Sequence, residues 1–249
     1  MTNSKVTLSG ALQDYLRAIY CLEKEGTGAS TSLLAERLGV SQPSVTSMVK
    51  KLASRKLISH APYLSITLTA AGQRLALETV RHHRLIETYL QRALGLGLEE
   101  LHDEAERLEH ALSEKLEDRI DAFLGHPAFD PHGSPIPDRD GRVSERRLVP
   151  LASLRPTENA VVSQITCRGH KQLQHLETIG LVPGTALRVK AADTGSGIMR
   201  LEFAAHPDEP VGDAAESDSG TAFGPTDRGS CGHGRADCRA AANPQGSRA

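Results

Sequence analysis

Histidine and carboxylate side chains recur at helical spacing in the middle of the chain. Four of them fall at offsets 0, +4, +7 and +8 and so share one side of a helix: His102, Glu106, Glu109 and His110. Apolar residues lie one position earlier, so this stripe is expected to border the core, where carboxylates are costly unless paired or bound to metal. On the preceding helix, His83 and Glu87 have i, i+4 spacing and could face the same place. Nitrogen and carboxylate ligands without thiolates favour Mn²⁺ or Fe²⁺, and the alternative is a solvated face of ion pairs.

Charge along the chain points to two kinds of partner. The 249 residues carry a net charge of −2, but residues 1–75 hold nine basic and four acidic side chains, whereas residues 76–140 hold seven basic and fifteen acidic ones. Six of the eleven histidines also lie in the acidic segment. We therefore expect a polyanion partner for the first segment and cations for the second.

Several protein classes are excluded by composition. No apolar run approaches the roughly 20 residues of a membrane helix, and the polar N-terminus is unlike a signal peptide, so we expect a cytoplasmic protein without a membrane partner. The four cysteines are too irregularly spaced for a disulfide framework. Cys21 and Cys167 are expected to be buried thiols, and a Zn²⁺ site at Cys231, His233 and Cys238 is less favoured than disorder.

The first elements predict a winged helix-turn-helix. Helices are expected at 10–25, at 30–38 and from the cap Ser41, with a turn at Gly39. A strand-like pattern at 57–68, interrupted by Pro62, predicts a short hairpin.

Helical periodicity returns after this hairpin. Helices are predicted at 69–95 and 98–124, the latter with a possible break near Ser113, and a proline-rich linker follows. Alternating patterns beyond the linker predict a small β-rich domain with one helix at about 170–179. The predicted fold class is mostly α, with a DNA-binding domain at 1–74, a helical dimerisation and metal-binding domain at 75–141, a linker and β domain at 142–205, and a disordered tail at 206–249.

The second helix of a helix-turn-helix presents its N-terminal side chains to base edges in the major groove. Here it offers small hydroxyls first and cations later, which suits base contacts followed by phosphate contacts; a polar helical domain with solvated lysines is the alternative. The candidate DNA-binding residues are Ser41, Gln42, Pro43, Ser44, Thr46, Ser47, Lys50, Lys51 and Arg55.

Four motifs, in order, resemble the diphtheria toxin repressor family of bacterial metal-dependent transcription regulators. They are the run from Asp14 to Tyr20, the pair Leu34–Leu38 and Ser41–Thr46, the run Arg81–Glu87, and the run His102–His110. The resemblance covers about residues 8–140 and extends into the linker at 133–137. Members with a third domain carry an SH3-like β-barrel there, and residues 176–184 look like it.

The resemblance implies two metal sites per subunit. The primary site falls on Asp14, Glu106, Glu109 and His110, the ancillary site falls on His83, Glu87 and His102, and Gln172 of the SH3-like domain is a further ligand. Iron-type members have sulfur side chains where this chain has Asp14 and Glu106, so the resemblance is to the manganese type, with Mn²⁺ preferred over Fe²⁺.

Two positions depart from the family pattern. Arg17 stands where manganese-type members often have a carboxylate, which favours two separated sites over a close binuclear arrangement. Gly169 stands where the SH3-like domain would supply a glutamate, and His170 or His175 could substitute for it.

The expected function is a metal-dependent regulator of transcription rather than an enzyme. The resemblance implies a homodimer on a palindromic double-stranded operator, repressing metal-uptake genes, with no small-molecule substrate. A second apolar face fits such a dimer: Leu75, Val80, Leu90, Leu94, Leu116 and Ile120. The alternatives are a carboxylate-ligated helical metalloenzyme, which would need two Glu-x-x-His elements, and a metal-independent DNA-binding dimer.

Overall fold

The computed structural model describes residues 9–60, 65–167, 169–193, 198–203 and 240–243. The chain divides into two compact units. The first holds residues 1–89, 103–128 and 136–144, and the second holds residues 90–102, 129–135 and 145–249. The predicted tail site at Cys231, His233 and Cys238 lies outside the described residues.

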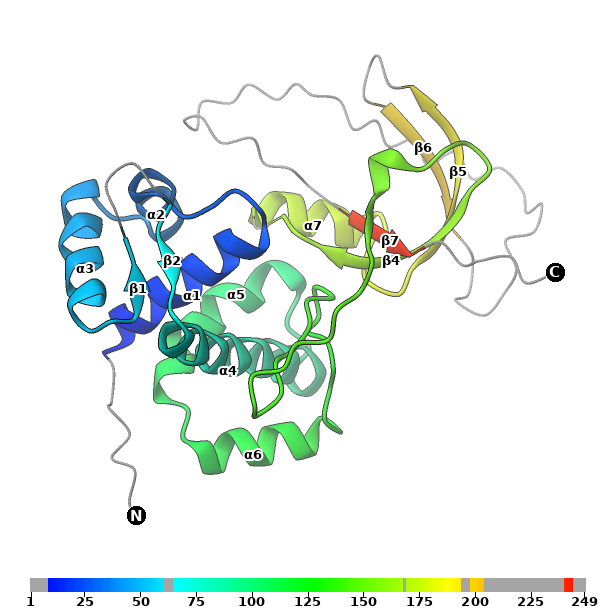
Figure 1. The fold of residues 1–249 in the computed structure, drawn as a ribbon. Helices are drawn as coiled ribbons and strands as arrows, with labels where there is room; N and C mark the ends of the chain where they lie inside the picture. The colour runs from blue at the N-terminus through cyan, green and yellow to red at the C-terminus, as the bar shows by residue number, and fades with distance from the viewer. Residues whose placement is uncertain (1–8, 61–64, 168, 194–197, 204–239, 244–249) are drawn as a thin grey trace. The chain divides into compact units, whose positions relative to one another are not determined.

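The N-terminal helices form the predicted helix-turn-helix (Figure 1). Ser30 accepts a hydrogen bond from the Leu33 backbone N–H and caps one helix, while Ser41 caps the next by accepting from Ser44. Gly39 between them has a φ of 62°, a left-handed conformation that suits glycine. The helices are α1 (Gly10–Lys24), α2 (Thr31–Leu38) and α3 (Gln42–Ser54), and the antiparallel wing strands are β1 (Ile58–Ser59) and β2 (Thr67–Leu68).

One apolar core connects these helices with the long helix α4 (Ala70–Leu94). Leu12, Leu16 and Ile19 on α1 are almost completely buried in it, together with Val80 of α4. This face of α1 is therefore fixed in the same core as the first half of α4.

The predicted helix at 98–124 is broken at the expected place. α5 (Leu98–Leu108) passes into a 3-10 turn, η1 (Glu109–Ala111), and Ser113 then caps α6 (Glu114–Phe123) through the Leu116 N–H. This change of winding corrects the prediction of a single stripe, because Glu109 turns into the interior while Leu108 is 46% exposed. A 3-10 turn rotates by about 120° per residue rather than 100°.

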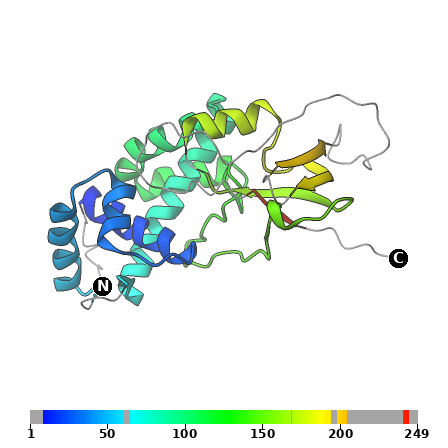
Figure 2. The same cartoon turned by 90° about the horizontal axis from the view of Figure 1, so that it is seen from above.

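The second unit contains a five-stranded antiparallel sheet and α7 (His170–Thr178), which confirms the small β domain (Figures 1 and 2). The strands lie in the order β3 (Val149–Pro150), β7 (Ala240–Asn243), β4 (Asn159–Ile165), β5 (Ala186–Asp193), β6 (Ile198–Phe203). Strand β7 lies within residues 206–249 and pairs with both β3 and β4. Backbone pairing requires no large apolar side chains, so composition did not indicate it.

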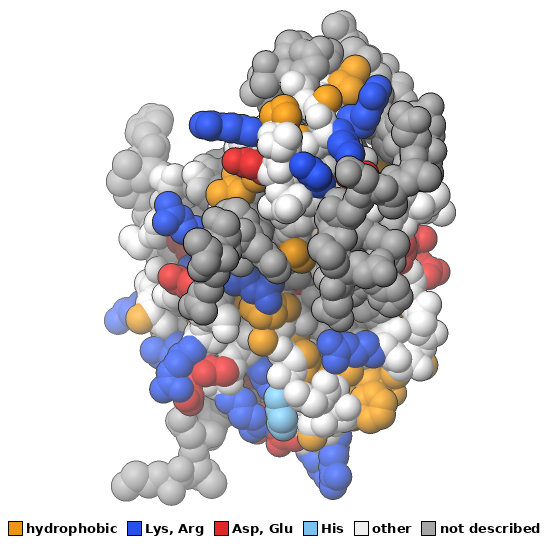
Figure 3. Space-filling view, turned by 90° about the vertical axis from the view of Figure 1, so that its right-hand side faces the viewer, with side chains coloured by type: hydrophobic (Ala, Val, Ile, Leu, Met, Phe, Trp, Pro, Cys, Tyr) orange, Lys and Arg blue, Asp and Glu red, His pale blue; other side chains and the backbone are white. Residues whose placement is uncertain are grey.

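Among the described residues, no helix is long and apolar enough to cross a membrane. On the face drawn in Figure 3, lysine and arginine side chains are spread among apolar and acidic ones rather than gathered in one patch.

The predicted apolar dimer face is only partly available. Val80, Leu90 and Ile120 are buried within the protomer. By contrast, Leu116 and Phe123 on α6 are 50% and 67% exposed, and Phe123 also packs edge-on against Tyr89. Leu94, at the end of α4, is 61% exposed. Sequence periodicity did not distinguish the residues that the protomer itself buries.

Candidate metal and DNA-binding sites

Three predicted ligands meet between α1 and the 3-10 turn η1. The potential ligand atoms of Asp14, Glu109 and His110 all lie within 4.8 Å of one another. His110 Nε2 lies 2.8 Å from Asp14 Oδ1 and 3.6 Å from Glu109 Oε1. The Glu109 side chain is fully buried, and its Oε1 has no hydrogen-bond partner. An orphaned buried carboxylate oxygen next to a second carboxylate and an imidazole is a donor set that fits a divalent cation.

The His110 imidazole is held from the side opposite this cluster. Its Nδ1 donates a hydrogen bond to Gln13 Oε1 at 2.7 Å, because an amide oxygen can only accept. A Cβ on Gly10 would lie 2.9 Å from His110 Cδ2, so the ring occupies space that only glycine leaves open. Sequence reasoning missed Gln13 and Gly10, although both lie within four residues of Asp14 on the same helix.

Burial is the largest influence on the Asp14 carboxyl. It raises the pKa of Asp14, as does the nearby Glu109 carboxylate, while His110 and Arg17 act in the opposite direction. A bound metal ion would stabilise the ionised form of Asp14 beside the Glu109 carboxylate, because nearby positive charge favours ionisation.

The fourth predicted ligand of the primary site, Glu106, is paired with Arg17 and is not part of this cluster. Arg17 donates to Glu106 Oε1 at 2.5 Å, and the Arg17 Nε lies 3.6 Å from Glu109 Oε1. The Arg17 side chain is only 8% exposed. The structure therefore brings together three of the four primary-site residues and places the fourth in an ion pair with an arginine.

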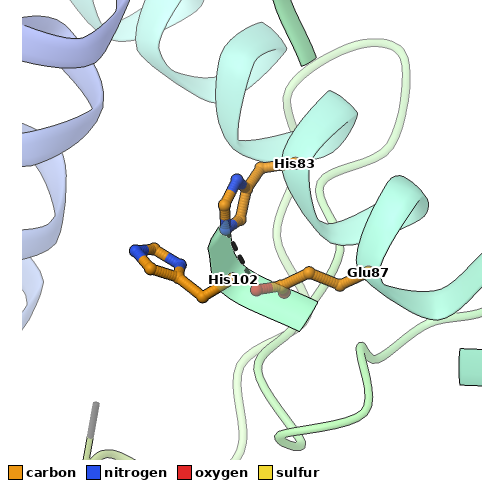
Figure 4. A group of neighbouring side chains, drawn as sticks. All are labelled: His83, Glu87 and His102. Atoms are coloured by element: carbon orange, nitrogen blue, oxygen red, sulfur yellow. Dashed lines mark ion pairs between the residues drawn. The ribbon is translucent and has the colours of Figure 1, made fainter. Parts of the chain in front are cut away.

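His83 connects Glu109 with the predicted ancillary site. Its Nδ1 lies 2.6 Å from Glu109 Oε2, and its Nε2 lies 3.0 Å from Glu87 Oε1. Figure 4 draws the His83–Glu87 ion pair on α4 with His102 of α5 as a neighbouring side chain. Burial acts to lower the pKa of His83, but attraction to Glu87 and the hydrogen bonds to both carboxylates outweigh it, so this pKa is raised.

The two residues that precede His83 in the chain, Arg81 and His82, belong to a separate buried network. Arg81 donates to Glu117 at 2.5 Å, to Asp121 at 2.9 Å and to the Pro137 carbonyl at 2.9 Å. His82 Nε2 lies 3.0 Å from Glu117, and its side chain is only 12% exposed. The His82 side chain is therefore turned toward α6, which supplies a carboxylate on that side of α4.

Gln172 lies on α7 of the second unit and is exposed, as are His170 and His175. Gly169 precedes this helix at its N-cap position. A ligand role for Gln172 stays a prediction.

The predicted DNA-contacting residues share one exposed face of α3. Val45, Val49 and Leu52 face the core, which leaves the polar positions outward. The exposed residues are Ser41, Gln42, Pro43, Ser44, Thr46, Ser47, Lys50, Lys51 and Arg55. Gln42 also donates to Ser32 of α2 at 3.3 Å, which connects the two helices at the start of α3.

A winged helix-turn-helix whose first helix contributes to a carboxylate–histidine cluster defines a metal-responsive DNA-binding protein. The models of two domains match in tandem, the iron dependent repressor N-terminal DNA binding domain at residues 7–66 and the iron dependent repressor metal binding and dimerisation domain at 69–138. A FeoA domain model matches residues 149–204.

Named relatives agree with these matches. The iron-dependent repressor IdeR of Mycobacterium leprae is 34% identical over 200 residues, covering 74% of this chain and 86% of the relative. The diphtheria toxin repressor of Corynebacterium glutamicum is 39% identical over 209 residues, covering 77% and 92%. Among solved structures, a manganese-dependent transcriptional repressor in complex with manganese is 40% identical, with a TM-score of 0.72 over 77% of this chain and 89% of the other.

The chain belongs to the diphtheria toxin repressor family of metal-dependent transcriptional repressors, with a C-terminal SH3-like domain. It is a DNA-binding regulator and not an enzyme, so the metalloenzyme alternative is wrong.

Proposed function

We propose that this repressor responds to Mn²⁺ in preference to Fe²⁺ and represses genes for metal uptake. The observation that carries the proposal is the buried Oε1 of Glu109, which has no hydrogen-bond partner and lies beside Asp14 and His110. The cluster offers oxygen and nitrogen donors, and hard oxygen donors suit Mn²⁺ better than softer ions. The cluster contains no sulfur ligand, since neither Cys21 nor Cys167 is a member of it.

A bound ion would supply positive charge and coordination bonds at this point. Asp14 belongs to the first helix of the DNA-binding domain, whereas Glu109 and His110 belong to the turn after α5. Without a bound metal ion, the Asp14 and Glu109 carboxylates face each other where α1 meets η1. Their repulsion then opposes the close approach of these two elements. The arrangement that holds Asp14 and Glu109 together therefore binds a metal ion more tightly than an arrangement that separates them. Such a difference in affinity between two states is what a switch requires.

His83, Glu87 and His102 are proposed as the ancillary site. The His83–Glu87 ion pair and the neighbouring His102 support this assignment. We also propose that Gln172 of the SH3-like domain contributes to this site.

The protein is proposed to act in the cytoplasm as a homodimer on a palindromic operator. Exposed Leu116 and Phe123 on α6 support a helical dimer contact. Two-fold symmetry would then present two α3 helices to successive major grooves, and metal and DNA binding would be coupled.

Calorimetric titration tests the metal assignment. Wild-type protein is expected to bind Mn²⁺ more tightly than anaerobic Fe²⁺, whereas Asp14→Asn and Glu109→Gln should lose the primary site. Glu104→Gln is the matched control, because Glu104 lies on α5 in an exposed ion pair with Arg107. Unchanged binding in Glu109→Gln would disprove the primary site.

A further inference from the structure

Arg17 lies among the side chains proposed as metal ligands. Its guanidinium is 2.5 Å from Glu106 Oε1 and 3.6 Å from Glu109 Oε1. Its Nη1 is also 3.4 Å from each ring nitrogen of His83. Within the described part of the chain, every hydrogen-bond or ion-pair partner of this buried arginine is therefore a proposed ligand of the primary or ancillary site.

The Arg17 charge is permanent and incompletely satisfied. Burial acts to lower the pKa of Arg17, but the Glu109 and Glu106 carboxylates outweigh it and raise this pKa further. Guanidinium groups do not lose their proton in proteins. Arg17 Nε and Glu109 Oε1 nevertheless each lack a hydrogen-bond partner, so this ion pair has Coulombic attraction without a hydrogen bond.

We propose that Arg17 is an internal cation that competes with the metal ion for Glu106 and Glu109 and thereby lowers the metal affinity of the sensor. This inference rests on the proposed function. Glu106 can serve as a ligand only if its carboxylate leaves or shares the guanidinium. A fixed positive charge this close to the cluster also repels a divalent cation.

Arg81 shows how a purely structural arginine is held in the same unit. Its side chain is also 8% exposed, but its three nitrogens donate to Glu117, Asp121 and the Pro137 carbonyl. None of these partners is a proposed ligand. Arg81 is therefore a control matched to Arg17 in residue type and burial.

The test measures Mn²⁺ affinity by calorimetry and thermal unfolding in chelator and in Mn²⁺. Arg17→Gln is expected to bind Mn²⁺ at least tenfold more tightly than wild type. Its Tm in chelator should fall, because Glu109 loses its buried counter-charge, and Mn²⁺ should raise its Tm by more than it raises that of wild type. Arg81→Gln should also have a lower Tm, with unchanged Mn²⁺ affinity.

Arg17→Lys keeps the charge but cannot present a planar fork to two carboxylates. We expect Arg17→Lys to bind Mn²⁺ about threefold more tightly than wild type. If Arg17→Gln does not fold in chelator, Arg17→Lys shows whether Arg17 competes with the metal ion. Equal or weaker Mn²⁺ binding by the folded Arg17 variants would overturn the competition. Absence of Mn²⁺ binding by wild-type protein would instead overturn the proposed function, which separates the two failures.

Discussion

The amide oxygen of Gln13 accepts a hydrogen bond from Nδ1 of His110 at 2.7 Å, across the junction between α1 and η1. Since this bond places a proton on Nδ1, it directs Nε2 toward Asp14 and the buried Glu109 oxygen. A partner on the second ring nitrogen is the usual means by which proteins orient a ligating histidine.

Gln13→Leu should therefore weaken Mn²⁺ binding by about tenfold, because His110 loses the acceptor that fixes its tautomer. Gln13→Glu retains an acceptor and should bind Mn²⁺ at least as tightly as wild type. Calorimetric titration of both variants checks this, and equal affinities for Gln13→Leu and wild type would exclude an orienting role.

Gly10→Val should also weaken Mn²⁺ binding, since even a Cβ at this position would lie 2.9 Å from the His110 ring and the ring would have to move. Ala11→Val on the next, exposed position of α1 is the control for the cost of a β-branched residue. If the two variants lose Mn²⁺ affinity equally, contact with His110 is not the cause.

The Glu117 network should make stability depend on acid pH. Burial acts to raise the pKa of Glu117, but hydrogen bonds and charges from His82 and Arg81 lower it from 4.5 to about 2. Because the pKa of Glu117 is depressed in the folded protein, its carboxylate stabilises the fold fully above about pH 4.5. This stabilisation is lost as the pH falls from there toward 2.

Urea unfolding of wild type and Glu117→Gln in chelator measures this contribution. We expect wild type to be more stable by about 1–3 kcal/mol at pH 6, a value reduced for partial solvent screening. The difference should narrow on moving to pH 3. A difference independent of pH would mean that the Glu117 charge does not stabilise the fold.

The extent of prediction from sequence differed between elements. Capping serines and Gly39 act locally, so the helix-turn-helix and the break at Ser113 were predicted correctly. The switch from α5 to the 3-10 turn at Glu109 was not, because a period of 3.6 residues describes the side of an ideal helix only. Tertiary packing turned Glu109 inward and left Leu108 exposed.

Residue pairing within the site was the least predictable part. Helical spacing indicated Glu109 and His110, the family resemblance added Asp14, and the structure brings the three together. The pairing of Glu106 with Arg17 depends on the packing of α1 beside α5, across 89 positions of sequence, and no local pattern encodes it. The backbone pairing of β7 was likewise invisible to composition.

Lys51→Ala should weaken DNA binding for all sequences and reduce the salt dependence of the affinity by about one phosphate contact. Lys51 is exposed on α3, while Val49 and Leu52 beside it hold the helix to the core. Titrations at several salt concentrations check the slope. An unchanged slope would place Lys51 away from the phosphates.

Metal-dependent DNA binding is the property that distinguishes a metal-gated repressor from a metal-independent one. We would measure fluorescence anisotropy on duplexes from upstream of the protein's own gene and of neighbouring metal-transporter genes, at fixed salt, with chelator, Mn²⁺ or anaerobic Fe²⁺. Wild-type protein should bind specifically only with metal and best with Mn²⁺, while Glu109→Gln should not respond to either ion. Specific binding of equal strength in chelator and in Mn²⁺ would exclude metal gating and leave a metal-independent DNA-binding dimer.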